Sequence, residues 1–495
     1  MRFHLNRSCS RLRRGSPWPT LRKPNSPVRY VSTRGRAPEL GFEDVLLTGL
    51  ARDGGLYVPA EWPHLTRDEI AELAGLSYVD AALRVIRPFV GAEIGEEELR
   101  GLLADAYRSF RHPAVAPLIQ IGPNDWLLEL FHGPTLAFKD IAMQVLARLM
   151  DRALDRRSAA LTIVGATSGD TGAAAIEAFR GREAIDVFIL YPHGRVSEAQ
   201  RRQMTTAVEP NVHAIAIDGT FDDCQTLLKA LFGDEALRDR LSLAGVNSIN
   251  WARLVAQIVY YFTAGVALGA PARSVSFSVP TGNFGDMFAG YVAMRMGLPV
   301  ERLLVATNVN DILARTIATG RYEPKAVAAT SSPSMDIQIS SNFERLIFEI
   351  AGRDAARVRE LMGNLATSGS FALNQGEHAS LKQLFAGARV DEDETRSVIR
   401  RLHEATGYIC DPHTAVGISA AAGVARDAAV PMVVMATAHA AKFPDAVASA
   451  IGVRPAEPAR LAGQRQLAER VTRLPNDLSA VAAFICEHAR VGRAQ

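Results

Sequence analysis

From about residue 117 onward, the chain alternates short runs of β-branched and aliphatic residues with longer stretches of helical periodicity. Parallel strands are buried on both faces and read as continuous apolar runs, while the helices between them cover the two faces of the sheet. The pattern therefore predicts an α/β body with parallel sheets. The expected strands are "LTIVGA", "DVFILYP", "VHAIAID", "SVSFSVP", "RLLVATN" and "PMVVMAT", and the expected helices cover 138–153, 172–180, 252–268 and 285–296.

A helix-rich region, about residues 42–115, precedes this body, and its stretch "TRDEIAELAGL" opens with a capping-box pattern. Residues 1–27 form a basic extension with seven Arg or Lys residues and no acidic residue. The extension is either an organellar transit peptide or an artefact of start-site choice. We favour the second reading, in which Val28 is the true start. The expected division is 1–27 as a disordered basic extension, 28–115 as an N-terminal domain, 116–465 as a catalytic region of two α/β domains, and 466–495 as a C-terminal helical segment.

Charge and cysteine usage exclude several classes of function. Without residues 1–27, the chain has 48 basic and 53 acidic residues, so its composition does not indicate nucleic-acid binding. The four cysteines lie far apart, which predicts no disulfide scaffold, no metal site and a reducing, cytoplasmic location. The longest apolar run, which begins at Leu254, is better explained as a buried core helix than as a membrane span.

Two expected strands are each followed by a glycine-containing loop and then a helix. The first is "LTIVGATSGDTGAAAIEAF" over 161–179, and the second is "SVSFSVPTGNFGDMFAGYVAMRM" over 274–296. Glycines let the backbone approach a ligand closely, and the free N–H groups at a helix N-terminus favour an anion. Each loop can therefore bind an anion, although a tight turn alone is the simpler reading. Neither loop matches the G-x-G-x-x-G or GK[ST] signatures of nucleotide-binding loops.

One lysine, Lys139, lies in "FHGPTLAFKD" (131–140), after a Gly-Pro turn and at the start of an apolar-periodic segment. Its neighbours Phe138 and Asp140 can fix its stem. A lysine used in chemistry typically forms a Schiff base, and pyridoxal phosphate is the commonest cofactor that it binds in this way. Lys139 and one glycine loop would meet the needs of that cofactor, which leaves the other loop for a substrate carboxylate. His132 in the same stretch either titrates near this lysine or only hydrogen-bonds the turn.

Ten stretches, in chain order, resemble threonine synthase, a fold-type II (tryptophan synthase β-like) pyridoxal-phosphate enzyme, in the longer form with an N-terminal domain. They span nearly everything from Val28 to about residue 450: "RYVSTRG", "ARDGGLYVP", "HGPTLAFKD", "ATSGDTGAAA", "GRVSEAQRRQMTT", "GTFDDCQ", "NSINWARL", "PTGNFGD", "SMDIQISSNFERL" and "TAHAAKFPD". One departure is His439-Ala440, where the family usually has His-Pro, and we expect it to affect only stability. The sequence suggests no residue-level role for "SSNFERL".

The resemblance implies roles for individual residues. Lys139 would be the catalytic, cofactor-bearing lysine, and Thr437 would lie at the pyridine nitrogen. The cofactor phosphate would be held by Gly282, Asn283, Phe284, Gly285 and Asp286. The substrate carboxylate would be received by the loop that contains Thr167, Ser168, Asp170 and Thr171. In that loop, Ser168 or Asp170 can also simply cap the following helix. The substrate phosphate would be bound by Asn247, Ser248 and Arg253.

The resemblance also implies an activity, a lyase reaction of threonine biosynthesis that converts O-phospho-L-homoserine and water into L-threonine and phosphate. The expected partners are this small-molecule substrate and the cofactor, with no nucleic acid and no membrane, in a monomer or homodimer. Three alternatives stay open at this point. The first is another fold-type II activity, such as a serine/threonine dehydratase or an O-acetylserine sulfhydrylase. The second is a pyridoxal-phosphate-binding relative without synthase activity. The third is an α/β protein without cofactor.

Overall fold

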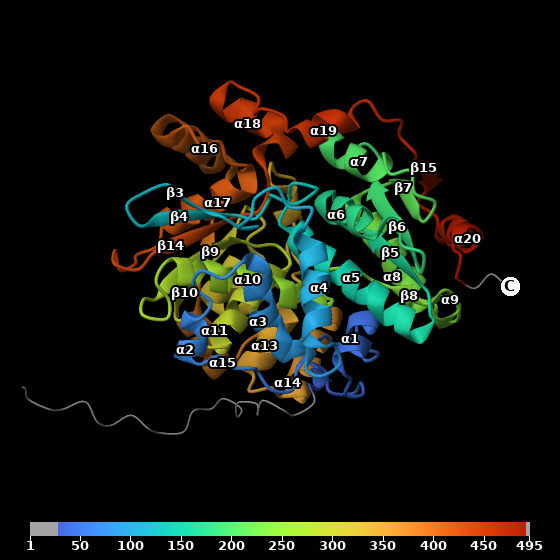
Figure 1. Ribbon diagram of the computed structural model, residues 1–495, viewed down its shortest axis with the longest axis horizontal. Coiled ribbons are helices and arrows are strands. Elements are labelled where there is room, and N and C mark those ends of the chain that lie inside the picture. The colour runs from blue at the N-terminus through green and yellow to red at the C-terminus, as the bar shows by residue number, and fades with distance from the viewer. Residues whose placement is uncertain (1–27, 492–495) are drawn as a thin grey trace, which may run out of the picture.

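The structure is a computed structural model that describes residues 28–491, and it contains two main sheets with helices on both faces of each (Figure 1). The larger sheet has the strand order β13-β10-β9-β14-β4-β3, and only β3 is antiparallel to its neighbour. The smaller sheet, β15-β7-β6-β5-β8, is entirely parallel. The expected α/β fold class is confirmed.

All six expected strands are present, with ends shifted by two residues at most, because long apolar runs identify buried parallel strands directly. The larger sheet contains β3 (Leu118–Gln120), β4 (Asp125–Glu129), β9 (Val275–Pro280), β10 (Val300–Thr307), β13 (Phe385–Arg389) and β14 (Met432–Ala436). The smaller sheet contains β5 (Leu161–Ala166), β6 (Ile185–Pro192), β7 (Val212–Asp218), β8 (Leu243–Ala244) and β15 (Thr472–Pro475).

Both faces of the larger sheet are covered. Successive side chains of a strand point to opposite faces, so in β14 Val434 packs toward α17 (Pro412–Ala422) while Val433 packs toward the central core. Helices α16 (Glu392–Thr406) and α18 (Pro444–Ile451) lie outside α17. On the opposite face lie α11 (Gly285–Arg295) and α12 (Ile312–Thr319), followed further out by α13 (Phe343–Ile350), α14 (Ala355–Ser368), α15 (Gln375–Leu384) and the short pair β11 (Arg321–Tyr322) and β12 (Phe371–Ala372).

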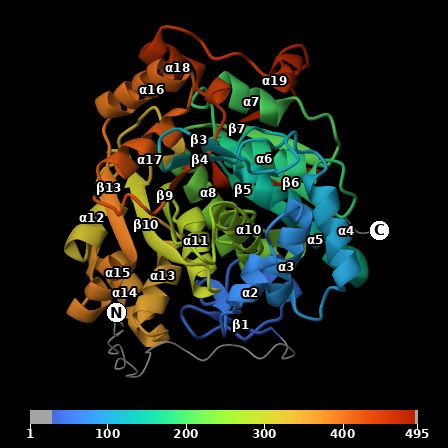
Figure 2. The same cartoon turned by 60° about the vertical axis from the view of Figure 1, so that its left-hand side comes forward.

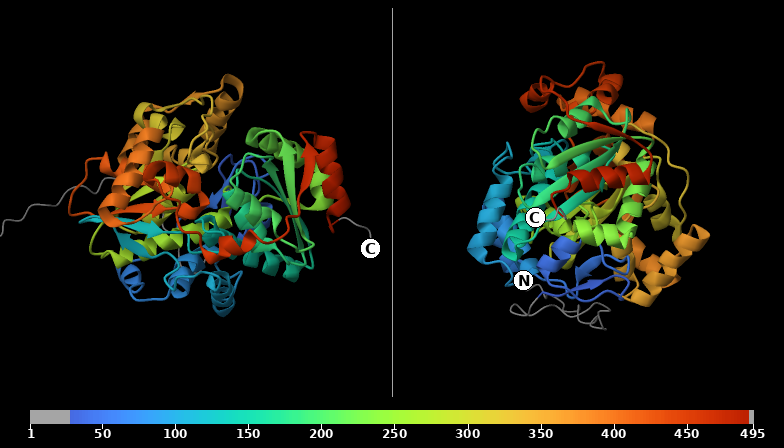
Figure 3. Two further views of the ribbon diagram at one scale, coloured as in Figure 1. Left: turned by 90° about the horizontal axis from the view of Figure 1, so that it is seen from above. Right: turned by 90° about the vertical axis from the view of Figure 1, so that its right-hand side faces the viewer.

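The smaller sheet forms a second lobe beside the larger one, as the view from above shows (Figure 3). One face packs on α6 (Asp170–Phe179), with α7 (Glu198–Thr205) beside it, and the other packs on α8 (Phe221–Gly233). Helices α9 (Glu235–Leu241), α19 (Ala459–Gln464) and α20 (Leu478–His488) complete this lobe. The C-terminal segment from 466, expected to be helical, also contains β15, which pairs with β7 and extends the sheet.

Two long helices lie between the sheets, α5 (Lys139–Arg157) and α10 (Trp251–Ala267). The long apolar run forms α10, which is buried on nearly all sides, so the expectation of a core helix is confirmed. Its first turn is capped by Asn250, whose side chain accepts a hydrogen bond from the Ala252 N–H at 3.0 Å. Within residues 28–491, no helix has the length and apolar character that crossing a bilayer requires.

The N-terminal region packs its helices against α5 and α10 (Figure 2). It contains β1 (Tyr30–Ser32), α1 (Phe42–Thr48), β2 (Tyr57–Pro59), α2 (Arg67–Ala71), α3 (Tyr78–Val90) and α4 (Glu96–Tyr107). The expected capping box is present at α2, where Thr66 and Glu69 exchange side-chain and backbone hydrogen bonds. The predictions for residues 1–27 lie outside the described residues.

Candidate active site

Lys139 is the first residue of α5, and its side chain is buried. A hydrogen bond of 2.8 Å from the Phe138 N–H to the Thr437 carbonyl places this helix start beside the end of β14. The Lys139 ammonium lies 4.7 Å from the centroid of the Phe138 ring and 3.6 Å from Asp170 Oδ2. The expectation that Phe138 fixes the lysine stem is therefore consistent with the geometry.

The surroundings of Lys139 lower the pKa of its amine. Burial lowers its pKa, and the charges of Lys442 and Arg253 lower that pKa further, while the Asp170 carboxylate opposes the shift. A lysine that acts as a base or nucleophile near neutral pH needs such a lowered pKa.

Asp140 fixes the preceding turn rather than the lysine. Its carboxylate accepts hydrogen bonds from the Thr135 N–H and the Thr135 hydroxyl, both at 2.7 Å. A Cβ atom at Gly133 would lie 2.5 Å from the Asp140 Cβ, so the turn requires a glycine there. Burial raises the pKa of Asp140 to about 6.

The loop 282–286 presents free backbone donors at the start of α11. Phe284 has a left-handed backbone with φ of 63°, which redirects the chain into the helix. No described residue accepts a hydrogen bond from the backbone N–H groups of residues 282–286. Because these donors lie at the positive end of a helix dipole, the loop fits a phosphate group.

The Asp286 side chain turns away from this loop and toward α10. Its Oδ1 accepts hydrogen bonds from the hydroxyls of Tyr260 and Tyr261, while its Oδ2 is buried without a hydrogen-bond partner among the described residues. Burial raises the pKa of Asp286 to about 6, although the two tyrosines oppose the shift. Asp286 therefore contributes its backbone N–H to the loop and a readily protonated carboxyl beneath it.

The stretch "SSNFERL", for which the sequence suggested no role, braces the glycine loop. The Ser340 hydroxyl donates to the Gly282 carbonyl at 2.8 Å. Both the backbone N–H and the side-chain amide of Asn342 donate to the Asn283 carbonyl, each at 3.1 Å. These bonds satisfy the carbonyls of the loop and leave its N–H groups free for an anion.

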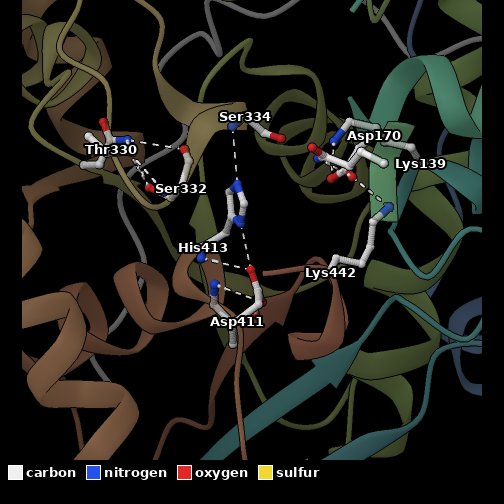
Figure 4. Close-up of polar contacts among 11 residues, drawn as sticks. Lys139, Asp170, Thr330, Ser332, Ser334, Asp411, His413 and Lys442 are labelled. Carbon is white, nitrogen blue, oxygen red and sulfur yellow. Dashed lines mark hydrogen bonds and ion pairs between the residues drawn. The ribbon is translucent and has the colours of Figure 1, made fainter. Parts of the chain in front are cut away.

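A second support comes from His413 and Asp411, which lie beside Ser334 of the loop 330–336 (Figure 4). His413 Nε2 accepts a hydrogen bond from the Ser334 N–H at 3.3 Å, so its Nδ1 carries the proton and donates to Asp411 Oδ1 at 2.7 Å. A Cβ atom at Gly282 would lie 2.7 Å from the Ser334 carbonyl oxygen. The glycine is therefore required by close packing of two backbones as well as by access to a ligand.

Thr437 is buried directly after β14, beside the start of α5. Its carbonyl is engaged by the Phe138 N–H, and its hydroxyl makes no hydrogen bond with a described residue. The hydroxyl is thus free to serve a ligand.

The loop 167–172 precedes α6 in the smaller lobe. The Thr167 hydroxyl accepts hydrogen bonds from the N–H groups of Gly169 at 3.0 Å and Gly172 at 2.9 Å, so Thr167 satisfies the helix start rather than Ser168 or Asp170. The side chains of Ser168 and Thr171 make no hydrogen bond with the rest of residues 28–491 and stay available. Gly169 has φ of 138°, a conformation that favours glycine.

Asp170 lies at the centre of this arrangement. Its Oδ1 is 2.7 Å from the ammonium of Lys442 and accepts a hydrogen bond of 2.9 Å from the Gln200 side chain (Figure 4). Sequence reasoning missed Lys442 and Gln200. The only signal for Lys442 was a lone lysine in the apolar stretch "HAAKFPD".

The predicted phosphate-binding residues of "NSINWAR" lie next to these elements. Arg253 is 3% exposed and donates from Nη1 to the Val246 carbonyl at 2.9 Å, but its Nε has no partner and no described carboxylate pairs with it. Burial lowers the pKa of Arg253 to about 10. Ser248 accepts a hydrogen bond of 3.2 Å from the Asn342 side chain, which places Ser248 at the glycine loop. The Asn247 side chain makes no hydrogen bond within residues 28–491. A buried guanidinium without a counter-ion indicates an anion site.

His132 is bonded rather than free. Its Nε2 lies 2.8 Å from Glu129 Oε2, and Tyr408 donates to the other oxygen of that carboxylate at 2.7 Å. This network supports the reading in which His132 stabilises the turn before Lys139.

At His439-Ala440, where the chain departs from the family pattern, His439 Nδ1 accepts a hydrogen bond from the Ala441 N–H at 3.1 Å, so the turn is held without the proline.

Taken together, the residues fit pyridoxal phosphate. The aldehyde of this cofactor matches a buried lysine with a lowered pKa, Lys139. Its phosphate matches the loop of free N–H groups at 282–286, and its ring matches the unpartnered buried hydroxyl of Thr437.

Comparisons with known proteins agree with this fit. Family models match residues 29–107 (threonine synthase N terminus), 116–373 (pyridoxal-phosphate dependent enzyme) and 414–485 (threonine synthase, C-terminal). The chain is 52% identical over 467 residues to a threonine synthase of Pseudomonas aeruginosa, covering 94% of this chain and 100% of that protein.

Solved structures give the same result. The chain superposes with a TM-score of 0.91 on a pyridoxal-phosphate-bound threonine synthase of Brucella melitensis, with 57% identity and coverage of 94% of this chain and 100% of that one. The yeast threonine synthase structure gives a TM-score of 0.88 at 39% identity, covering 93% of this chain and 98% of that one. The chain therefore belongs to the threonine synthase family.

Proposed function

We propose that this chain is a threonine synthase in which Lys139 carries the cofactor and moves the protons of the reaction. As a pyridoxal-phosphate-dependent lyase, the enzyme converts O-phospho-L-homoserine and water into L-threonine and phosphate. The observation that carries the assignment of Lys139 is its buried ammonium, which lies 3.6 Å from Asp170. The helix start that bears this lysine is bonded to the Thr437 carbonyl through the Phe138 N–H.

The cofactor is held by residues of the larger lobe. The N–H groups of residues 282–286 would hold its phosphate, and the hydroxyl of Thr437 would serve its pyridine nitrogen. A hydroxyl at this position, unlike a carboxylate, does not favour protonation of the ring nitrogen. When bound, pyridoxal phosphate supplies an electron sink for the negative charge that develops on the substrate carbon atoms.

The substrate is recognised at its two anionic ends. Its carboxylate accepts hydrogen bonds from the loop that contains Thr167, Ser168, Asp170 and Thr171. Its phosphate binds Arg253, with Asn247 and Ser248 beside it. The unpaired Nε of Arg253 supports this assignment, because a buried guanidinium without a carboxylate leaves a net positive charge for a phosphate.

The reaction removes protons from Cα and Cβ of the substrate and releases phosphate from Cγ. A proton is then added at Cγ, hydroxide from water is added at Cβ, and a proton returns to Cα. Lys139 moves these protons, because burial lowers the pKa of its amine and makes the neutral form, which can accept a proton, more accessible. The adjacent Asp170 orients the amine, and the Phe138 ring limits the positions that its stem can take.

The test is a phosphate-release assay with O-phospho-L-homoserine, run beside an assay for ketoacid release from threonine. Wild type and Lys229→Ala, which changes an exposed lysine on α8, should release phosphate at equal rates. Lys139→Ala should lose the visible absorption of the bound cofactor and at least about a thousandfold in rate. Ketoacid release from threonine without phosphate release from phosphohomoserine would overturn the assignment in favour of a dehydratase.

The remaining proposals concern the whole protein. We propose that it acts in a reducing compartment, the cytoplasm, which the free thiols of Cys224, Cys410 and Cys486 support. We also propose that it is a monomer or homodimer. Light scattering after gel filtration measures the oligomeric state. The proposed division is 28–115, 116–465 and 466–495, with 1–27 as an extension.

A further inference from the structure

A completely buried lysine outside the predicted site contacts the carboxylate nearest to Lys139. Lys442 ends the short helix η2 (Ala440–Lys442), and its side chain has no exposed surface. Its ammonium lies 2.7 Å from Asp170 Oδ1 and donates a hydrogen bond of 2.8 Å to the Thr135 carbonyl (Figure 4). Each oxygen of Asp170 thus faces a different lysine, since Oδ2 lies 3.6 Å from Lys139 Nζ.

These groups come from both lobes. Asp170 begins α6 on the smaller sheet, whereas Lys442 follows β14 of the larger sheet. From α7, Gln200 donates to Asp170 at 2.9 Å, and Gln203 donates to the same Thr135 carbonyl at 3.0 Å. The carboxylate and the ammonium of Lys442 are therefore held in place by independent contacts on each side.

The pKa of Asp170 is shifted in the opposite direction from the pKa of two other buried carboxyls in this chain. Burial raises the pKa of Asp140 and of Asp286 to about 6. Burial acts on Asp170 in the same direction, but the charges of Lys442 and Lys139, with the hydrogen bonds from Lys442 and Gln200, hold its pKa far below the usual range. The charges of the two lysines are the largest of the effects that oppose burial at Asp170.

We propose that Lys442 is a positioning residue for the reaction, which keeps Asp170 ionised and disfavours a proton on the Lys139 amine. The proposal rests on the proposed function of Lys139. In a chemical cycle, Lys139 loses its own charge whenever it gives up a proton. Asp170 then still has the ammonium of Lys442 as its counter-ion, so it stays an oriented hydrogen-bond acceptor and does not compete for the proton.

The like charge of Lys442 acts on Lys139 directly as well. A neighbouring cation makes the protonated amine less favourable, which is one of the recognised ways to activate a lysine. Residue usage is consistent with a special requirement, because the chain has six lysines against 49 arginines. Of the five lysines at 28–491, Lys139 and Lys442 are the buried ones, while the others lie on the surface.

The test measures the protonation of Lys139 in the full-length chain after removal of the cofactor. Trace labelling with acetic anhydride at a series of pH values, read by mass spectrometry of the lysine peptides, gives a midpoint for each amine. In Lys442→Met, the Lys139 midpoint should rise by about one to three pH units, because a like charge is lost and the Asp170 carboxylate remains. Lys442→Arg should restore most of this shift, since the charge is kept.

Two controls keep the result interpretable. Lys229, an exposed lysine in the same digest, should keep its midpoint in every variant. Asp170→Asn should move the Lys139 midpoint the other way, down by about one unit or more, because a neighbouring negative charge is lost. Lys442→Gln, which also removes the charge of Lys442, decides the question if Lys442→Met does not fold. A folded Lys442→Met with an unchanged Lys139 midpoint, or an Asp170→Asn without a downward shift, would overturn the proposal. The labelling result is independent of turnover, so the proposed function fails separately, through the phosphate-release assay.

Discussion

Replacing Asp286 by asparagine should stabilise the protein at neutral pH and change little in mild acid. Asp286 lies beneath the glycine loop, where its Oδ1 accepts hydrogen bonds from Tyr260 and Tyr261 and its Oδ2 has no partner among the described residues. An asparagine keeps an oxygen for the two tyrosines and has the same shape. It differs mainly in that it never ionises.

The magnitude follows from the pKa of Asp286, which burial raises from 3.8 to about 6. Between these two values, the unfolded chain releases the proton while the folded protein keeps it. The free energy of unfolding therefore falls as the pH rises, by about 1.4 kcal/mol per unit, and levels off above the folded pKa. Over about two units the carboxylate costs roughly 3 kcal/mol, which Asp286→Asn should recover in full near pH 7 and not at all below pH ~4.

The assay is urea unfolding of wild type and Asp286→Asn, both stripped of cofactor, followed by fluorescence and circular dichroism across this pH range. Only the difference between the two proteins is used, because the other titrating groups then cancel. Asp239→Asn, which changes an exposed carboxylate on α9, should show no such pH-dependent difference. A difference between wild type and Asp286→Asn that stays constant from mild acid to neutral pH would refute the reasoning.

Two further predictions concern ligand binding. Gly282→Ala should weaken pyridoxal phosphate binding by about tenfold or more, because its Cβ would lie 2.7 Å from the Ser334 carbonyl oxygen and displace the loop. Titration of the visible cofactor absorption measures this affinity. The matched control is Gly363→Ala on α14, where a Cβ meets nothing within 4 Å. Equal cofactor affinity in the two variants would contradict the prediction. Arg253→Met should raise the KM for phosphohomoserine by about tenfold or more and leave cofactor affinity unchanged, since its unpaired guanidinium is assigned to the substrate phosphate. Steady-state phosphate release gives the KM, and a loss of cofactor affinity instead would assign Arg253 to the cofactor.

The local elements could be predicted from the sequence because their signals are local. Apolar runs such as 161–166 identify strands that are buried on both faces, and the residues after them identify glycine loops at helix starts. The setting of Lys139 could be predicted for the same reason, since the turn, the aromatic neighbour and the helix start all lie within ten residues of the chain.

Only the tertiary structure decided which distant groups share the site. Lys442 approaches Asp170 because the segment after β14 lies beside the start of α6, and Asn342 reaches the Asn283 carbonyl because α13 begins beside the start of α11. Likewise, β15 joins the smaller sheet through its pairing with β7. A periodic pattern reports which face of an element is buried, but not which element covers it, so these pairings and the charge states that depend on them follow from the packing alone.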